Sequence, residues 1–118
     1  MSQLTTQDMP AGERSLSEQF RLVALKYIDQ DAAAKILEEL KTARLSELIG
    51  DAMRQDATLA FNKAEGLVKS SKEWQSYISE MVEARKLANR LKLQLEYLRM
   101  RHSEWMSSEA TARAERRQ

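Results

Sequence analysis

The chain has 118 residues, of which 42% are hydrophobic, and 19 Lys or Arg against 18 Asp or Glu leave a formal net charge of +1. Three glycines and one proline are too few for the turns of an all-β fold, and the absence of cysteine excludes a disulfide scaffold or a thiolate zinc site. The abundant residues are good helix formers, so the composition predicts an all-α fold.

Cofactor and membrane signals are also missing from the sequence. One histidine cannot build a multi-histidine metal site, and no apolar run approaches the roughly 18 residues that cross a bilayer. The start, MSQLTTQDMPAGERS, lacks the positive charge and apolar core of a secretory signal. We therefore expect no metal, no cofactor, no membrane partner and a cytoplasmic location.

The first half of the chain predicts a polar arm and several short helices. Residues 1–14 show no apolar period and are expected to be a flexible arm, while residues 15–118 form a single helical domain. Ser15 and Glu18 match a capping box for a helix over residues 16–28, and residues 29–31 read as a break. Residues 32–68 keep a helical period, as two helices or one helix bent near Gly50.

The second half predicts one long helix. Residues 69–72 form the next break, with Ser70 and Glu73 in capping-box relation, and no glycine or proline follows. From Trp74 onwards a heptad places apolar residues at positions a and d, so we expect a helix of about 40 residues with coiled-coil-like packing. The earlier helices would fold back on it as a long helical hairpin or bundle, and the uncovered seam predicts a homo-oligomer. The expected interface residues are Trp74, Tyr77, Met81, Leu91, Leu95, Leu98, His102 and Trp105.

No pattern for catalysis accompanies His102, the only histidine. There is no serine or cysteine elbow, no phosphate loop and no dinucleotide fingerprint. His102 falls at a seam position, which is typical of a histidine that sets register. The chain is therefore expected not to be an enzyme, and no catalytic residue is assigned.

Positive charge is concentrated in the predicted long helix. Residues 84–101 hold six Lys or Arg and one Glu, although the whole chain is nearly neutral. Arg85, Lys92 and Arg99 share heptad position e, beside the seam. This stripe either pairs with acidic residues of a neighbouring helix or forms a ladder of cations for phosphates. The candidate nucleic-acid-binding residues are Arg85, Lys86, Arg90, Lys92, Arg99 and Arg101.

The last 45 or so residues resemble small helical proteins from the early or recombination regions of temperate bacteriophages and prophages. The resemblance rests on Glu73-Trp74 and on the runs at residues 81–85, 96–101 and 109–113. The layout is also similar to that of phage recombination mediators, which are small helical oligomers that help to load a recombinase on single strands. The resemblance implies an accessory protein of phage DNA metabolism, located in the host cytoplasm, with no catalytic residues to carry over.

Three functional hypotheses follow. The first is a non-enzymatic helical oligomer that assists phage DNA recombination or replication by contacting single-stranded DNA or a DNA-processing protein such as a recombinase or nuclease. The second is a protein–protein interaction module, structural or inhibitory, with no nucleic-acid binding. The third is a scaffold or virion-assembly component.

Overall fold

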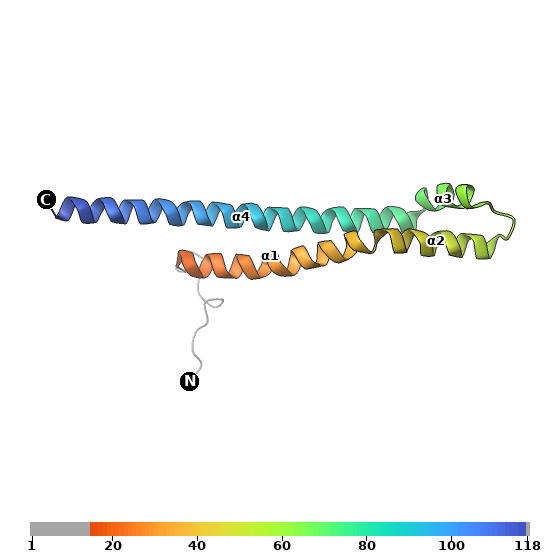
Figure 1. Ribbon diagram of the computed structural model, residues 1–118, viewed down its shortest axis with the longest axis horizontal. Helices are drawn as coiled ribbons and strands as arrows, with labels where there is room; N and C mark the ends of the chain where they lie inside the picture. Colours follow the sequence, from red (N-terminus) through yellow and green to blue (C-terminus); the bar gives the residue numbers. More distant parts are fainter. Residues whose placement is uncertain (1–14, 118) are drawn as a thin grey trace, which may run out of the picture. The chain divides into compact units, whose positions relative to one another are not determined.

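The computed structural model describes residues 15–117, and the predicted arm at residues 1–14 lies outside the described residues. Within residues 15–117 the chain forms four helices and no strand: α1 (Leu16–Glu39), α2 (Lys41–Gln55), α3 (Phe61–Lys69) and α4 (Lys72–Arg116) (Figure 1). This confirms the all-α prediction for this part of the chain. By their internal contacts these residues divide into two units, residues 15–29 with 89–117, and residues 30–88.

Helix α1 begins at the predicted cap. The backbone N–H of Glu18 donates to Ser15 Oγ at 3.2 Å, which satisfies one of the free amides of the first turn. The predicted break at residues 29–31 is wrong, because α1 continues to Glu39. Asp31 lies within α1, where its carboxylate pairs with Lys35 one turn later, at 3.0 Å. The three alanines that follow it are strong helix formers.

The chain reverses at residues 56–60 rather than near Gly50. Gly50 lies inside α2, which continues past it to Gln55. Asp56 instead leaves the helix with an extended backbone, and its Oδ1 accepts hydrogen bonds from the backbone N–H and the hydroxyl of Thr58, at 3.1 and 2.6 Å. Such a side-chain turn stabilises a non-helical backbone.

The break before α4 is confirmed, but its cap lies one residue later than expected. Ser71 Oγ accepts from the backbone N–H of Trp74 at 3.3 Å and donates to the carbonyl of Val68 at 2.6 Å. Ser70 Oγ donates to the carbonyl of Gly66 at 2.9 Å. The predicted capping role of Ser70 is therefore wrong, because its hydroxyl donates to a carbonyl in the last turn of α3. Ser71 is the residue that caps α4.

Helix α4 is one uninterrupted helix of 45 residues, which confirms the long helix expected from the heptad pattern (Figure 1). Every a and d position from Trp74 to Leu98 is buried or half-buried, while most other positions of this stretch are exposed. The coiled-coil-like seam is therefore confirmed up to Leu98. His102 and Trp105, the next two seam positions, are exposed.

The unit of residues 30–88 has a small core where α2 and α3 pack against the start of α4. Its buried residues in this cluster are Ile49, Ala64, Val68 and Trp74. The ring of Tyr77 stacks on Trp74 with centroids 5.8 Å apart. The hydroxyl of Tyr77 donates to the carbonyl of Leu37, which ties α1 to α4 beside this core.

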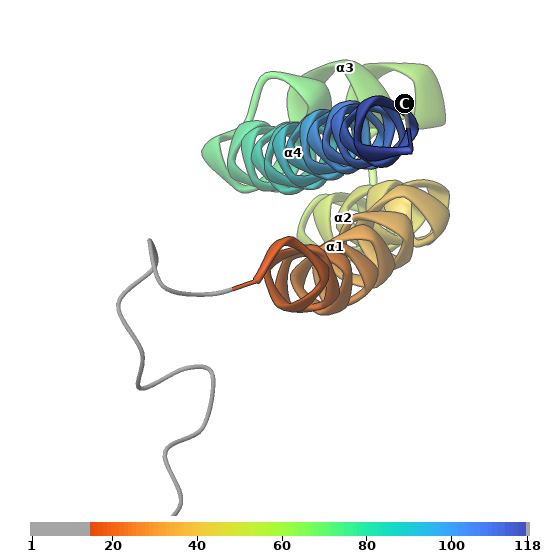
Figure 2. The ribbon, with the colours of Figure 1, turned by 90° about the vertical axis from the view of Figure 1, so that its left-hand side faces the viewer.

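In the unit of residues 15–29 and 89–117, α1 lies alongside α4 and runs antiparallel to it (Figures 1 and 2). Val23 from α1 and Leu98 from α4 are buried here. Leu91 and Leu95, the preceding seam residues, are half-buried. The predicted helical hairpin is therefore formed within the chain.

Candidate functional site

Arg85, one of the three predicted ladder cations, is held by two carboxylates of α1. Its Nε and Nη2 donate to Glu38 at 2.9 and 2.7 Å, and its Nη1 donates to Asp31 at 2.7 Å. Asp31 and Glu38 stand seven residues apart, or two helical turns, so both face the same side of α1. Of the two alternatives for the cation stripe, Arg85 therefore follows the first. It pairs with acidic residues of a neighbouring helix, and that helix belongs to the same chain.

The charges of this cluster reinforce one another. Hydrogen bonds from the Arg85 guanidinium, with a further hydrogen bond from Lys35, hold the pKa of Asp31 below its usual value. The pKa of Glu38 is lowered by the same guanidinium, and in return the two carboxylates raise the pKa of Arg85. All three groups are thus more firmly ionised than in an unfolded chain.

The other predicted cations point to solvent. Lys86 lies 3.9 Å from Glu83 of the preceding turn, which is a weak surface pair. Arg90, Lys92 and Arg101 are exposed and make no ion pair within residues 15–117. The guanidinium of Arg99 is also exposed and lies 5.9 Å from the centre of the Phe20 ring, a cation–π contact that leaves its positive charge unneutralised.

Helix geometry divides these exposed cations between two edges of α4. Lys92 and Arg99 stand seven residues apart, about 10.5 Å along the helix, on the same edge of the seam. Arg90 and Arg101 lie towards the other edge, with the exposed ring of Tyr97 between them in sequence. Residues 89–101 therefore present four cations and one carboxylate, that of Glu96, on a single helix.

The predicted interface residues fall into two groups. The first group is buried or half-buried within the chain: Trp74, Tyr77, Met81, Leu91, Leu95 and Leu98. The second group is His102 and Trp105, which stay exposed and stack on each other with ring centroids 6.1 Å apart. Contact between these residues and a second copy of the chain stays a prediction.

The exposed end of the seam is hollowed. Leu16, Ser17 and Phe20 of α1 face Leu98, Arg99 and His102 of α4 around one hollow. A second hollow shares Leu16, Ser17 and His102 with the first and extends to Trp105. The structure thus brings Arg99, a predicted phosphate contact, together with His102 and Trp105, which the sequence placed on the interface.

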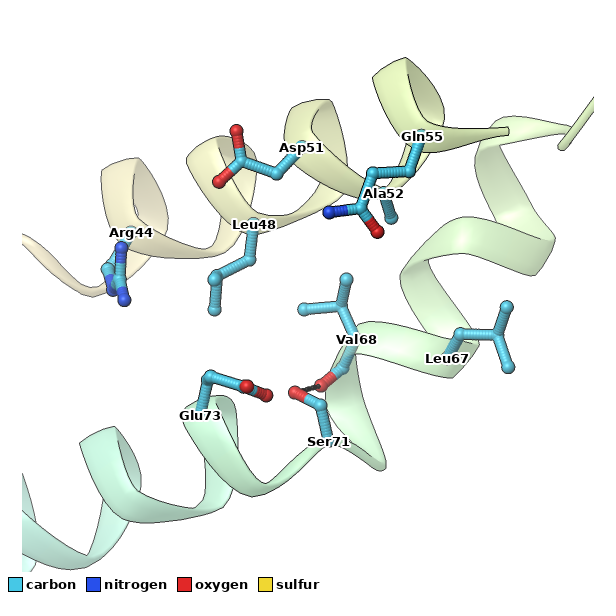
Figure 3. Close-up of a pocket in the computed structure, with 9 residues that line it drawn as sticks. All are labelled: Arg44, Leu48, Asp51, Ala52, Gln55, Leu67, Val68, Ser71 and Glu73. Carbon is cyan, nitrogen blue, oxygen red and sulfur yellow. Dashed lines mark hydrogen bonds between the residues drawn. The ribbon is translucent and has the colours of Figure 1, made fainter. Parts of the chain in front are cut away.

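A further groove lies between α2 and the α3–α4 junction (Figure 3). Leu48 and Val68 point towards each other across it, and Asp51, Gln55 and Glu73 add polar groups to its lining. Two of its charged groups already have ionic partners: Arg44 pairs with Glu47 at 2.8 Å, and Asp51 pairs with Arg54. The groove continues the small core of this unit outwards, with no concentration of one charge.

Sequence reasoning missed three of the residues that define this surface. Asp31 was placed in a predicted helix break, and Glu38 and Phe20 received no role beside α4. A usable signal was present for the acidic pair, because Asp31 and Glu38 repeat at the seven-residue spacing of the cations. Phe20 carried only the signal of an apolar position in a helical period.

Comparison of the chain with models of known families, with curated proteins and with solved structures found no match. What the geometry defines is a class, an all-α protein with a long helical hairpin and coiled-coil-like packing. Across residues 15–117, no helix combines the length and the apolar character needed to cross a membrane.

Proposed function

We propose that this chain is a non-enzymatic accessory protein of phage DNA recombination or replication, which binds single-stranded DNA through α4. The phage part of this proposal rests on the resemblance of residues 73–115 to small helical proteins of temperate bacteriophages and prophages. The observation that carries the DNA-binding part is the cluster of exposed cations within residues 89–101 of α4 that have no carboxylate partner among residues 15–117: Arg90, Lys92, Arg99 and Arg101.

Cations of this kind bind phosphates without reading sequence. Each neutralised phosphate releases condensed counterions, so binding weakens steeply as salt rises. Arg85 takes no part in this proposal, because Asp31 and Glu38 already neutralise it. The proposed contact surface is therefore residues 90–101 of α4, which is shorter than the ladder expected from the sequence.

The test is a fluorescence-anisotropy titration of a labelled 20-nucleotide oligo(dT) with the full chain at several salt concentrations. The test variant is Lys92→Gln with Arg101→Gln. The control is Lys63→Gln with Lys72→Gln, which removes the same charge from two exposed lysines outside the surface. We expect the plot of log K against log salt to be less steep for the test variant, by about 1.4 in slope. Each phosphate contact to a single strand contributes about −0.7 to this slope, and the variant removes two contacts.

The control should bind as the unmodified chain does. Absence of binding at micromolar protein and low salt would refute the DNA-binding part of the proposal. Equal weakening of the test and control variants would also count against it, because net charge and not this surface would then govern binding.

A second candidate function is a protein–protein interaction module without nucleic-acid binding. The favouring observation is an apolar strip on the outer face of α4, where Leu93, Tyr97 and Met100 are 65%, 54% and 60% exposed. Residues four and three apart lie on one helix face, so the three side chains adjoin. On this alternative, oligo(dT) does not bind, and Leu93→Glu abolishes a protein complex that the Lys92→Gln, Arg101→Gln variant retains.

A further inference from the structure

The two adjoining hollows at the start of α1 have a simple structural origin. Helix α1 begins at Leu16, opposite His102, whereas α4 runs on to Arg116. Within the described residues, the seam of α4 therefore loses its partner helix near His102. Trp105, at the next seam position, has 51% of its surface exposed.

The hollows are lined by aromatic and cationic groups. The imidazole of His102 stacks on the indole of Trp105, and the ring of Phe20 lies under the guanidinium of Arg99. No Asp or Glu is among the described residues that line either hollow. An apolar, aromatic hollow edged by an unneutralised cation suits a flat ligand that carries negative charge on one side.

A nucleotide in a single strand has this chemistry. Its base offers a flat face that stacks on aromatic side chains, and its phosphate is held by nearby cations. Arg99 lies at the hollow itself, and Lys92 stands two helical turns away on the same edge of α4. The two cations therefore lie beside the part of the seam that carries His102 and Trp105, in the unit of residues 15–29 and 89–117.

We infer that the hollow at Trp105 takes one base of a single DNA strand, stacked on the indole, with phosphates further along the strand at Arg99 and Lys92. The inference rests on the proposed function, because it assigns to single-strand binding a base-stacking site besides the phosphate contacts. The site is independent of base identity, since every base has a flat face. It predicts a contribution to affinity that salt does not remove.

The experiment measures binding of the full chain to a 20-nucleotide oligo(dT) and to an abasic strand of the same length. Trp105→Leu should weaken binding to oligo(dT) by roughly 5- to 150-fold, the range for one stacked base, and leave the salt slope unchanged. Trp105→Tyr should restore most of the affinity. On the abasic strand, the unmodified chain and Trp105→Leu should bind equally.

Phe61→Leu is the matched control, because Phe61 of α3 is as exposed as Trp105 but lies outside both the hollow and residues 90–101. It should bind oligo(dT) as the unmodified chain does, and far-ultraviolet circular dichroism should show that all variants keep their helices. If oligo(dT) binds with a salt-dependent affinity that Trp105→Leu does not change, the base-stacking site is refuted and the proposed function stands. If oligo(dT) does not bind at all, both are refuted.

A protein ligand for the hollow is the other outcome that overturns the inference. In that case Trp105→Leu would abolish a protein complex while binding to oligo(dT) and to the abasic strand stayed equal. Tryptophan emission gives a further readout. Trp74 is 6% exposed and Trp105 is half-exposed, so quenching on addition of oligo(dT) should disappear in Trp105→Tyr.

Discussion

Arg85 of α4 and Glu38 of α1 form a bidentate ion pair, with Nε and Nη2 of the guanidinium at 2.9 and 2.7 Å from the two carboxylate oxygens. The third donor, Nη1, reaches Asp31 two turns earlier on α1. One planar group thus joins two points of α1, a geometry that arginine can satisfy and lysine cannot. The pair lies at the edge of the seam and fixes how residues 31–38 sit against α4.

Replacing Arg85 should loosen this contact. Arg85→Ala leaves two neighbouring carboxylates without their shared cation, so we expect a lower melting temperature in thermal unfolding followed by circular dichroism. Arg85→Lys should recover only part of the loss, because an ammonium group cannot bridge both carboxylates with the same geometry. Lys86→Ala is the control, since Lys86 adjoins Arg85 in sequence but has only a distant contact with Glu83. Equal melting temperatures for Arg85→Ala and Lys86→Ala would contradict the role of the pair.

The same cluster predicts a dependence of stability on pH. Arg85 lowers the pKa of Asp31 and Glu38 below their usual values of 3.8 and 4.5. A carboxyl group with a lowered folded pKa stabilises the fold above its unfolded pKa, and this stabilisation is lost as the pH falls through the folded pKa. The difference in melting temperature between the unmodified chain and Arg85→Ala should therefore be constant from pH 7 to about 5 and shrink below about 4.5.

The comparison with Arg85→Ala is needed because Asp56 behaves similarly. Hydrogen bonds from Thr58 lower the pKa of Asp56, so part of any acid destabilisation arises at the α2–α3 turn. The contribution of Asp56 is the same in the unmodified chain and in Arg85→Ala, so it cancels in the difference between their melting temperatures. A difference that stays constant down to pH 2.5 would show that the carboxylates are not stabilised by Arg85.

The cap of α4 gives a third prediction, with a neighbouring serine as its control. Ser71→Ala removes the acceptor for the backbone N–H of Trp74, so it should lower the free energy of unfolding by about 1 kcal/mol, as loss of an N-cap does. Ser70→Ala removes only a hydroxyl that donates to the last turn of α3, and should cost less. Urea unfolding followed by circular dichroism measures both. A larger loss for Ser70→Ala than for Ser71→Ala would restore the cap position expected from the sequence.

The long helix and its seam could be predicted because both depend on local spacing. Repeats of three and four place Trp74 and Leu98 on one face whatever lies opposite, and the structure buries both. The absence of glycine and proline after Gly66 leaves nothing to end the helix early. Such features are fixed by the segment itself.

The helix breaks depended on smaller local energies and were harder to predict. Gly50 costs roughly 1 kcal/mol against alanine inside a helix, which α2 tolerates. The turn forms where Asp56 and Thr58 supply side-chain hydrogen bonds, a local pattern that could have been recognised. The partners of Arg85 could not be predicted from local sequence, because Glu38 and Asp31 lie 47 and 54 residues away. The register of α1 against α4 decides which residues meet.

The two tryptophans should differ sharply in their contribution to stability. Trp74 is 6% exposed and packs in the core with Ile49 and Val68, so Trp74→Ala should lower the free energy of unfolding by about 3–5 kcal/mol through lost burial and an unfilled cavity. Trp105→Ala, at a half-exposed position, should cost less than about 1 kcal/mol. Urea unfolding followed by circular dichroism measures both, and Trp74→Phe, which leaves a smaller cavity, should give an intermediate value if Trp74→Ala does not fold. Similar losses for the two alanine variants would mean that Trp105 is covered in solution, which would contradict the open hollow at the end of the seam.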